Sequence, residues 1–342
     1  MELSIIVPVY NMASDGKLEY CLNSLLAQSL KSYEIIAVDD ASTDDSLKLL
    51  SEYAKRYPEK IRVIASKENH HQGGARNLGI QAAEGEFVGF MDSDDWAAPD
   101  MYEKLLSRAR KTGADVVGCD YSIVYEHGMT PGRVVQMNTA EQTGSLTEEK
   151  KRLLILKPGS MVVKIYRREL ITKNRLWFPE DIFYEDNCMA PLWMIHGTHF
   201  ERVEEPLYFY YQHEDSTVHH ISLQKCKDRV TAMELLLTKA GECGIYERFL
   251  PELMFKYTEL GFVNTLFSCM GGRMKGRYRF VRQLRKTLLD RFPRFAENEY
   301  YQERINREEK KLIGFLVKSQ AFFFLYYRAL YLYRTIRKKG RA

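Results

Sequence analysis

The sequence predicts an α/β protein with a Rossmann-like, mainly parallel sheet and a helical C-terminal region. Strand-like apolar runs alternate with helix-periodic segments from residue 5 to residue 119, and repeated β-α-β alternation is typical of a parallel sheet covered by helices on both faces. From residue 223 onward only helical periodicity remains. An apolar run over 87–91 then ends in three carboxylates within four positions. Because ligands of such sheets bind beyond the carboxyl ends of the strands, we expect the functional site there.

The elements follow one another in a regular order. The expected strands cover residues 5–9, 34–40, 61–65, 87–92 and 116–119. The expected helices of this half cover residues 18–28, 44–56, 74–83 and 99–112. A chain of 342 residues is long enough for a domain with an appendage, so we expect a first domain over 1–220 and a helical region over 221–342.

The composition is that of a soluble globular protein, with 45% hydrophobic and 28% charged residues. The six cysteines include no C-x-x-C pair, which favours reduced thiols in the cytoplasm over a disulfide framework or a zinc site. The chain enters a strand at residue 3 without a basic and apolar leader, so we expect no signal peptide. No run of 18 apolar residues predicts a membrane-spanning helix.

Aromatic and acidic residues follow the first two strands. Tyr10 either stacks on a nucleotide base or packs against the end of its strand. Asp39 and Asp40 precede a helix whose expected N-cap is Asp44. The pair is therefore not needed for N-capping, and we expect it to have another role. A carboxylate at a strand end accepts hydrogen bonds from a base N–H or a ribose hydroxyl.

The third strand is followed by Gly73 and Gly74, which we expect to open a helix with Arg76 in its first turn. A helix N-terminus with an arginine receives phosphate. The spacing matches neither the dinucleotide-binding fingerprint nor a P-loop. The adjacent His70 and His71 point apart and favour a solvated loop over a metal site.

The fourth strand ends in the D-x-D-D cluster of Asp92, Asp94 and Asp95. These carboxylates repel one another, so we expect a cation among them. Hard oxygen ligands favour Mg²⁺ or Mn²⁺, and such an ion bridges a carboxylate to a diphosphate. The alternative is a solvated acidic turn, or an N-cap for the helix that starts near Pro99.

These segments occur in a specific order, and by that order the chain resembles the family 2 glycosyltransferases, which have the GT-A fold. The resemblance covers about residues 1–215 and is carried by 4–11 (SIIVPVYN), 38–44 (VDDASTD), 74–79 (GARNLG) and 90–95 (FMDSDD). It implies a GT-A catalytic domain over 1–220 that binds a nucleotide-diphosphate sugar donor together with Mn²⁺ or Mg²⁺.

The resemblance also implies where the donor binds. It places Pro8, Tyr10, Asp39 and Asp40 around the base. The ribose, diphosphate and metal then lie at Asp92, Asp94 and Asp95, and members of the family differ in which of these acids ligates the metal. Many relatives carry Tyr-Arg where this chain has Gln212 and His213, so His213 either donates to the diphosphate or is structural. The expected donor-binding residues are Pro8, Tyr10, Asn11, Asp39, Asp40, Arg76, Asp92, Ser93, Asp94 and His213.

Glycosyl transfer also needs a base that removes the proton of the acceptor hydroxyl. Glu185 and Asp186 lie just before a buried helix expected over 188–196, where acids also stabilise the helix start by about 0.3–1 kcal/mol. By resemblance, Asp186 is the general base and Glu185 positions the acceptor. One base attacking in line inverts the anomeric carbon. Lys164 contacts the acceptor or a phosphate, or else lies on the surface.

The C-terminal region is basic and aromatic. Seven Lys and Arg residues occur within 273–286, and aromatic residues interleave with arginines over 322–341. This pattern suits the surface of an anionic membrane. Alternatively, the aromatic residues pack on the first domain or in a homo-oligomer contact. No known binding motif accompanies the charge, so we expect no nucleic acid partner.

We therefore expect a cytoplasmic, inverting, metal-dependent glycosyltransferase on the inner face of the membrane. Its acceptor would be a glycan or a lipid-linked molecule in cell-surface polysaccharide synthesis, and UDP is the most frequent carrier in the family. A nucleotidyltransferase would need a glycine-rich loop with a basic residue after the first strand, and residues 11–15 do not fit this pattern. A non-catalytic homologue that binds nucleotide or membrane as a scaffold is the remaining alternative.

Overall fold

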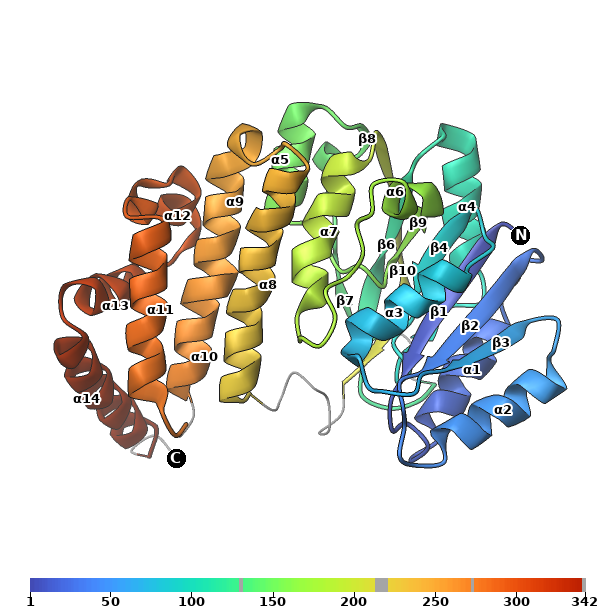
Figure 1. Ribbon diagram of the computed structural model, residues 1–342, viewed down its shortest axis with the longest axis horizontal. Helices are drawn as coiled ribbons and strands as arrows, with labels where there is room; N and C mark the ends of the chain where they lie inside the picture. Colours follow the sequence, from blue (N-terminus) through green and yellow to red (C-terminus); the bar gives the residue numbers. More distant parts are fainter. Residues whose placement is uncertain (129–131, 213–220, 272–273, 340–342) are drawn as a thin grey trace. The chain divides into compact units, whose positions relative to one another are not determined.

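The computed structural model describes residues 1–128, 132–212, 221–271 and 274–339, without the side chains of 334–339 (Figure 1). The chain divides into two compact units. The α/β unit comprises Met1–His220 with Leu235–Glu242, and the helical unit comprises Ile221–Glu234 with Cys243–Ala342. This organisation confirms the predicted class, an α/β protein with a helical C-terminal region.

The α/β unit is built on one mixed sheet. Its strands are β1 (Leu3–Val9), β2 (Tyr33–Asp39), β3 (Ile61–Ala65), β4 (Phe87–Phe90), β5 (Trp96–Ala97), β6 (Val116–Val124), β7 (Arg133–Val135), β8 (Gly144–Ser145), β9 (Lys164–Arg167) and β10 (His199–Tyr211). Their order is β3-β2-β1-β4-β9-β6-β10-β5, with β7 beside β6 and β8 beside β10. The strands β1 to β4 are parallel, as predicted. An antiparallel strand, β9, lies between β4 and β6.

The helices cover both faces of the sheet. The main helices of this half are α1 (Lys17–Leu26), α2 (Ser46–Arg56), α3 (His71–Ala82), α4 (Met101–Thr112), α5 (Glu148–Leu156), α6 (Arg168–Thr172) and α7 (Glu185–His196). Gly89 of β4 faces Tyr102 of α4, whereas the next residue, Phe90, stacks against Trp193 of α7 with ring centroids 5.8 Å apart. Successive strand residues point to opposite faces, so α4 and α7 cover opposite sides. Helix α3 packs on β1 and β2, in front of them in Figure 1.

Several element ends differ from the prediction, as β6 and α2 illustrate. Strand β6 continues to Val124 and is almost entirely buried, although Asp120 and Ser122 interrupt its apolar pattern. Helix α2 starts at Ser46, and Asp44 accepts a hydrogen bond from Ser46 N at 2.9 Å without being the N-cap residue itself. In both cases the local pattern identifies the element, while hydrogen bonds to neighbouring segments set its end.

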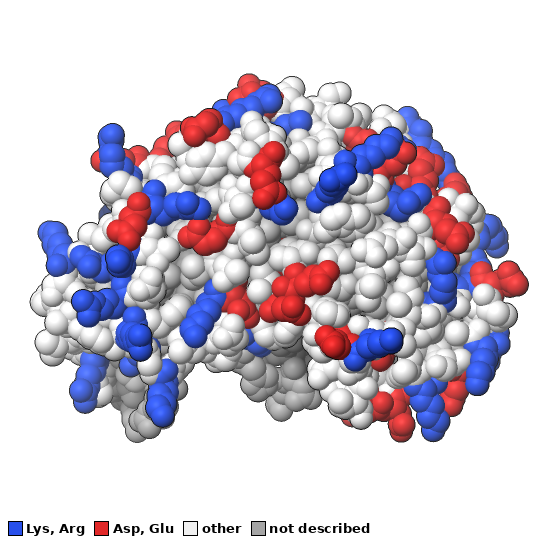
Figure 2. Space-filling model, in the orientation of Figure 1, with Lys and Arg blue, Asp and Glu red and all other residues white. Residues whose placement is uncertain are grey.

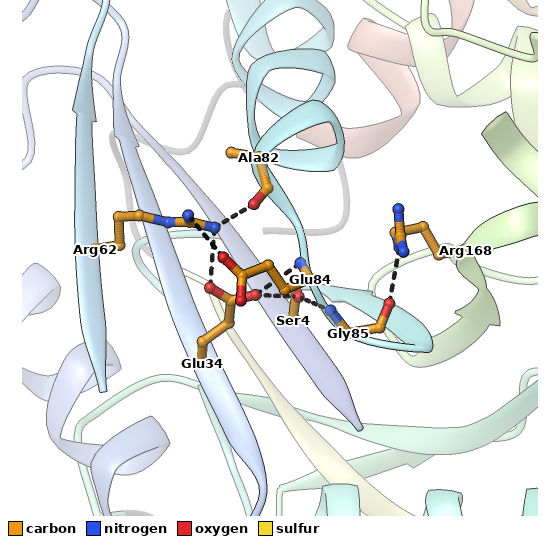
Figure 3. Close-up of polar contacts among 7 residues, drawn as sticks. All are labelled: Ser4, Glu34, Arg62, Ala82, Glu84, Gly85 and Arg168. Atoms are coloured by element: carbon orange, nitrogen blue, oxygen red, sulfur yellow. Dashed lines mark hydrogen bonds and ion pairs between the residues drawn. The ribbon is translucent and has the colours of Figure 1, made fainter. Parts of the chain in front are cut away.

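A partly buried polar network joins the amino ends of the parallel strands (Figure 3). Ser4 Oγ donates to Glu34 Oε1 at 2.6 Å and accepts from Gly85 N at 2.8 Å. Arg62 of β3 pairs with Glu34 Oε2 at 3.0 Å, and Arg168 Nε donates to Gly85 O at 2.8 Å. These bonds fix β1, β2, β3 and the start of β4 relative to one another. The opposite edge, at the carboxyl ends, carries the predicted functional loops.

The helical unit consists of helices packed on a core that includes Phe249, Phe262 and Leu288, each at most 1% exposed. The helices from residue 223 are α8 (Leu223–Glu242), α9 (Leu250–Lys256), a π-helical stretch (Tyr257–Asn264), α10 (Thr265–Gly271), α11 (Arg277–Arg291), α12 (Glu299–Arg304), α13 (Arg307–Lys318) and α14 (Gln320–Lys339). Short 3₁₀ turns cover Glu247–Phe249 and Phe295–Glu297 in this unit and Ala140–Gln142 in the α/β unit. Within the described part of the chain, no helix is long and apolar enough to cross a membrane.

Candidate active site

The loop after β1 is fastened to the loop after β2. Asn11 N donates to Ser42 Oγ at 3.0 Å, and Asn11 Oδ1 accepts from Thr43 N at 2.8 Å. Met12 N donates to Ser46 Oγ at 2.7 Å. The Asn11 side chain therefore holds the two loops together, a structural task that sequence reasoning did not assign to it.

The end of β1 combines a buried and an exposed residue. Pro8 is buried and pairs with Val38 of β2, whereas the pairing of β1 with β4 ends at Ile6. Pro8 therefore lies beyond the last residue of β1 that pairs with β4. The N–H group that proline lacks is not needed there for a hydrogen bond to β4. Tyr10 is 48% exposed, so the ring is not packed into the protein and presents a face to solvent.

A buried carboxylate oxygen lies at the end of β2. Asp39 is 1% exposed, and its Oδ2 accepts from Ser42 N at 3.1 Å. Among the described residues no donor reaches its buried Oδ1. Asp40 accepts from His70 N at 2.9 Å, and burial raises the pKa of Asp40 although this hydrogen bond opposes the shift. Buried polar atoms normally have a partner, so the Asp39 Oδ1 atom is suited to a ligand N–H or O–H donor.

Helix α3 begins at His71, three residues earlier than expected, so Arg76 lies in the second turn rather than the first. A Cβ on Gly73 would lie 2.2 Å from Pro179 O, and one on Gly74 would lie 2.3 Å from His70 Cβ. The two glycines therefore permit the close approach of α3 to neighbouring backbone and side chain. This packing, rather than a phosphate-binding loop, explains them.

Arg76 connects the two acidic clusters predicted from distant parts of the sequence. Its side chain is 3% exposed, and NH2 pairs with Asp92 Oδ1 at 2.9 Å while NH1 contacts Glu185 Oε1. Burial acts to lower the pKa of Arg76, but Glu185 and Asp92 outweigh it and the pKa is raised. The guanidinium is turned toward carboxylates inside the protein. Its place in the second turn corrects the expected helix start, and its predicted contact with the donor stays a prediction.

Glu185 and Asp186 start helix α7, directly after Tyr184 in a left-handed conformation with a φ of 68°. Burial raises the pKa of Glu185 to about 7, an effect that Arg76 opposes and the Asp186 charge reinforces. The Asp186 charge also contributes to the raised pKa of Asp92, whose main cause is burial. Asp186 is half-buried, whereas Glu185 is 4% exposed. The acids after β4 and those at the start of α7 are thus parts of one electrostatic cluster.

Asp95 fastens the acidic turn to β10. Its Oδ2 accepts from Tyr208 OH at 2.5 Å, and its Oδ1 accepts from Tyr211 N at 2.8 Å. Burial, followed by the charges of Asp94 and Asp92, raises the pKa of Asp95 well above its usual range. Both oxygens thus carry protein hydrogen bonds, which favours a positioning role for Asp95 over metal ligation. Sequence reasoning missed Tyr208 because this partner lies 113 positions away.

The carboxylates of Asp92 and Asp94 fit a hard divalent cation. Both residues are half-buried in the turn after β4, with the buried Ser93 between them. Within the described ranges, no three His, Cys, Asp or Glu side chains are grouped to hold a metal by themselves. Mg²⁺ is commonly bound through one or two carboxylates together with substrate phosphates and water, so this donor set fits a cation that arrives with a diphosphate.

Two further candidates have different outcomes. Lys164 is 1% exposed and donates from Nζ to Ser160 O at 2.7 Å, which excludes the surface alternative. Burial lowers the pKa of Lys164 to about 7. His213 lies outside the described residues, so its predicted contact with the diphosphate stays a prediction.

Comparison with known proteins places this geometry in context. The sequence model of glycosyl transferase family 2 matches residues 4–174, half of the chain. The uncharacterized glycosyltransferase YibD of Escherichia coli K12 is 32% identical over 63% of this chain. The uncharacterized glycosyltransferase EpsJ of Bacillus subtilis 168 is 34% identical over 63% of it. In both cases the match spans 62% of the relative's own length.

A solved structure extends the likeness over most of the chain. S. aureus TarS 1–349, crystallised in complex with UDP-GlcNAc, superposes with a TM-score of 0.63 and 22% sequence identity. The superposition covers 93% of this chain and 92% of that one. The likeness confirms the predicted GT-A fold.

Proposed function

Because the chain belongs to glycosyl transferase family 2, we propose that it is an inverting glycosyltransferase that uses a UDP-sugar donor. The acceptor in this proposal is a glycan or lipid-linked molecule of cell-surface polysaccharide synthesis. The observation that carries it is the Arg76 bridge, which brings Asp92 and Glu185 into one site. Transfer in a single displacement requires donor-side and acceptor-side groups to be held together in this way.

Donor recognition is proposed at the ends of β1 and β2. The exposed ring of Tyr10 would stack on the base, and Asp39 Oδ1 and Asp40 would accept hydrogen bonds from the base or ribose. The UDP-GlcNAc bound to TarS supports UDP as the carrier. A diphosphate then reaches the turn that holds Asp92 and Asp94.

In the proposed catalytic step, the acids of the site have different roles. Asp186 removes the proton of the acceptor hydroxyl, whose oxygen attacks the anomeric carbon opposite the leaving diphosphate and inverts the configuration. Arg76 holds Glu185 and Asp92 in place on either side. Asp94 and Asp92 would hold Mn²⁺ or Mg²⁺, which offsets the negative charge of the leaving diphosphate when bound.

The cellular location is a further part of the proposal. The aromatic and basic surface of α11 and α14 would place the enzyme on the inner, cytoplasmic face of the membrane as a peripheral protein. A homo-oligomer contact is the alternative use of that surface.

The test is nucleotide release from UDP-sugars in the presence of Mn²⁺ and a mixture of glycan and lipid-linked acceptors. We expect the variant Asp186→Asn to lose about 100-fold or more of the rate, as loss of a general base does, and to keep its affinity for UDP. The matched control is Asp181→Asn, whose side chain is 70% exposed five positions earlier and which should keep its activity. Full activity in Asp186→Asn would place the base elsewhere, and UDP binding without any release would favour a non-catalytic homologue.

A further inference from the structure

The helical unit contains a cavity that the transferase proposal does not use. It lies among α10, α11 and α14 and has a volume of about 650 Å³, within the range of small-molecule sites. Most of its walls are apolar or aromatic, and its charged groups are Arg277 and Arg328. No Asp or Glu is found among the described residues that line it.

The cavity opens on an exposed apolar surface. Three of its lining residues, Tyr278, Leu325 and Tyr331, are 54%, 71% and 61% exposed. Exposed apolar side chains that are contiguous around a concave site are typical of surfaces that bind a partner.

The cavity walls are held in place by contacts between α11 and α14. The rings of Tyr278 and Phe324 are 5.0 Å apart, and the Arg277 guanidinium lies 5.9 Å from the centre of the Phe324 ring. Gln320 Nε2 donates to Tyr278 O at 2.7 Å. The arginine therefore belongs to the wall of a built site rather than to a loose surface chain.

The surroundings of the cavity are positively charged. Helix α14 contains no Asp or Glu over Gln320–Lys339. Lys and Arg gather over the α11–α14 end of the helical unit, with few acidic side chains in view (Figure 2). A ligand with an anionic head and an apolar body is complementary to both features.

We propose that this cavity binds an anionic phospholipid, with an acyl chain against its aromatic walls and the phosphate on Arg277 and Arg328, and so docks the helical unit on the membrane. Arginine binds phosphate through parallel charged hydrogen bonds, and aromatic residues favour the boundary between headgroups and acyl chains. This inference extends the membrane part of the proposed function by naming a ligand and its site. The chemistry at Asp186 does not depend on it.

The experiment is calorimetric titration of the full chain with dioctanoyl phosphatidylglycerol below its micelle concentration. We expect saturable binding of one lipid per chain. Arg328→Gln and Leu325→Glu should each weaken lipid binding by about 10-fold or more. The first removes a charged contact to the phosphate, and the second adds a negative charge that repels it. The matched controls are Arg282→Gln on α11 and Leu332→Glu on α14, exposed positions outside the cavity, which should leave the affinity within about twofold.

Flotation with vesicles of phosphatidylcholine, with and without phosphatidylglycerol, completes the test. Binding only to the anionic vesicles, reduced more by Leu325→Glu than by Leu332→Glu, supports the site. Vesicle binding without any binding of the monomeric lipid would mean that surface charge alone attracts the protein to the vesicles, and it would overturn the proposal. A dimer that Leu325→Glu abolishes would overturn it as well, because the surface would then be a contact between two copies of the chain. UDP titration of the same variants separates these results from a failure of the transferase proposal, since all the changes lie in the helical unit.

Discussion

Arg76 is the residue through which the separate acids of the site become one cluster. Its two carboxylate partners are 16 and 109 positions away in the sequence. Arg76 is buried and pairs with the buried Glu185 and the half-buried Asp92, so removal of the arginine leaves carboxylates without their cationic partner in a poorly solvated environment. We therefore expect fold stability and the proposed transfer activity to depend on the same side chain.

We expect Arg76→Met to lower the free energy of unfolding by about 3–5 kcal/mol, as measured by urea denaturation with tryptophan fluorescence. Arg110→Met is the control, because Arg110 is 48% exposed in its pair with Glu2 and such surface pairs contribute about 1 kcal/mol or less. Equal effects of the two substitutions would show that the Arg76 bridge does not stabilise the fold.

Glu185 makes stability depend on pH in a defined direction. Its pKa is raised by burial to about 7, so the group stabilises the fold while it is protonated and this contribution is lost as pH rises through about 7. The difference in unfolding free energy between wild type and Glu185→Gln should therefore shift against the wild type between pH 5 and pH 8. A difference that stays constant, or that moves in the opposite direction, would show that Arg76 keeps Glu185 ionised throughout this range.

At the scale of single residues, sequence reasoning identified the acids but not their partners. Asp92 stands out because it follows an apolar run, whereas Glu185 and Asp186 were assigned through the family resemblance. The bridge by Arg76 and the bond from Tyr208 to Asp95 depend on contacts across the fold, for which a local pattern carries no signal. The unpartnered oxygen of Asp39 likewise becomes visible only once its surroundings are known.

At the scale of elements, packing between α3 and the segment before α7 aligns the two halves of the site. Gly73 faces Pro179 O so closely that a side chain there would force the segments apart. The sequence indicated a glycine-rich helix start, and the structure shows that the glycines adjoin a segment about one hundred residues away.

We expect Gly73→Ala to destabilise the protein by about 1–3 kcal/mol, because the new Cβ must displace backbone. Gly241→Ala in α8 is the control, since no heavy atom lies within 4 Å of its added Cβ and alanine in a helix is favoured over glycine by about 0.5–1 kcal/mol. Opposite signs of the two effects in thermal or urea unfolding are the expected result. A stabilised Gly73→Ala would contradict the packing explanation.

The parallel strands β1 to β4 could be predicted, whereas the antiparallel β9 and the long β10, which is parallel to β6, could not. Strands β1, β2 and β4 are largely apolar, buried runs separated by helices, which is the pattern of parallel strands buried on both faces. Strand β9 has only four residues, and β10 has a pairing register that shifts between Arg202 and Tyr208. Short or irregular strands are defined by their neighbours rather than by their own periodicity.

At the scale of the whole molecule, the two units carry different surface chemistry. The formal net charge of +4 is unremarkable for 342 residues. The charge is unevenly distributed, because acids gather at the carboxyl ends of the sheet while α14 has none. This distribution is consistent with a donor site in one unit and an anion-binding surface in the other.

The most direct test is calorimetric titration of UDP, GDP, CDP and TDP into the full chain, each with and without Mn²⁺. We expect UDP to bind far more tightly than the others and only with Mn²⁺, and we expect Asp94→Asn to weaken the metal-dependent part. An affinity for UDP that neither Mn²⁺ nor Asp94→Asn changes would contradict the metal assignment. No binding of any nucleotide would contradict the assignment of this acidic cluster as a sugar-nucleotide transferase site.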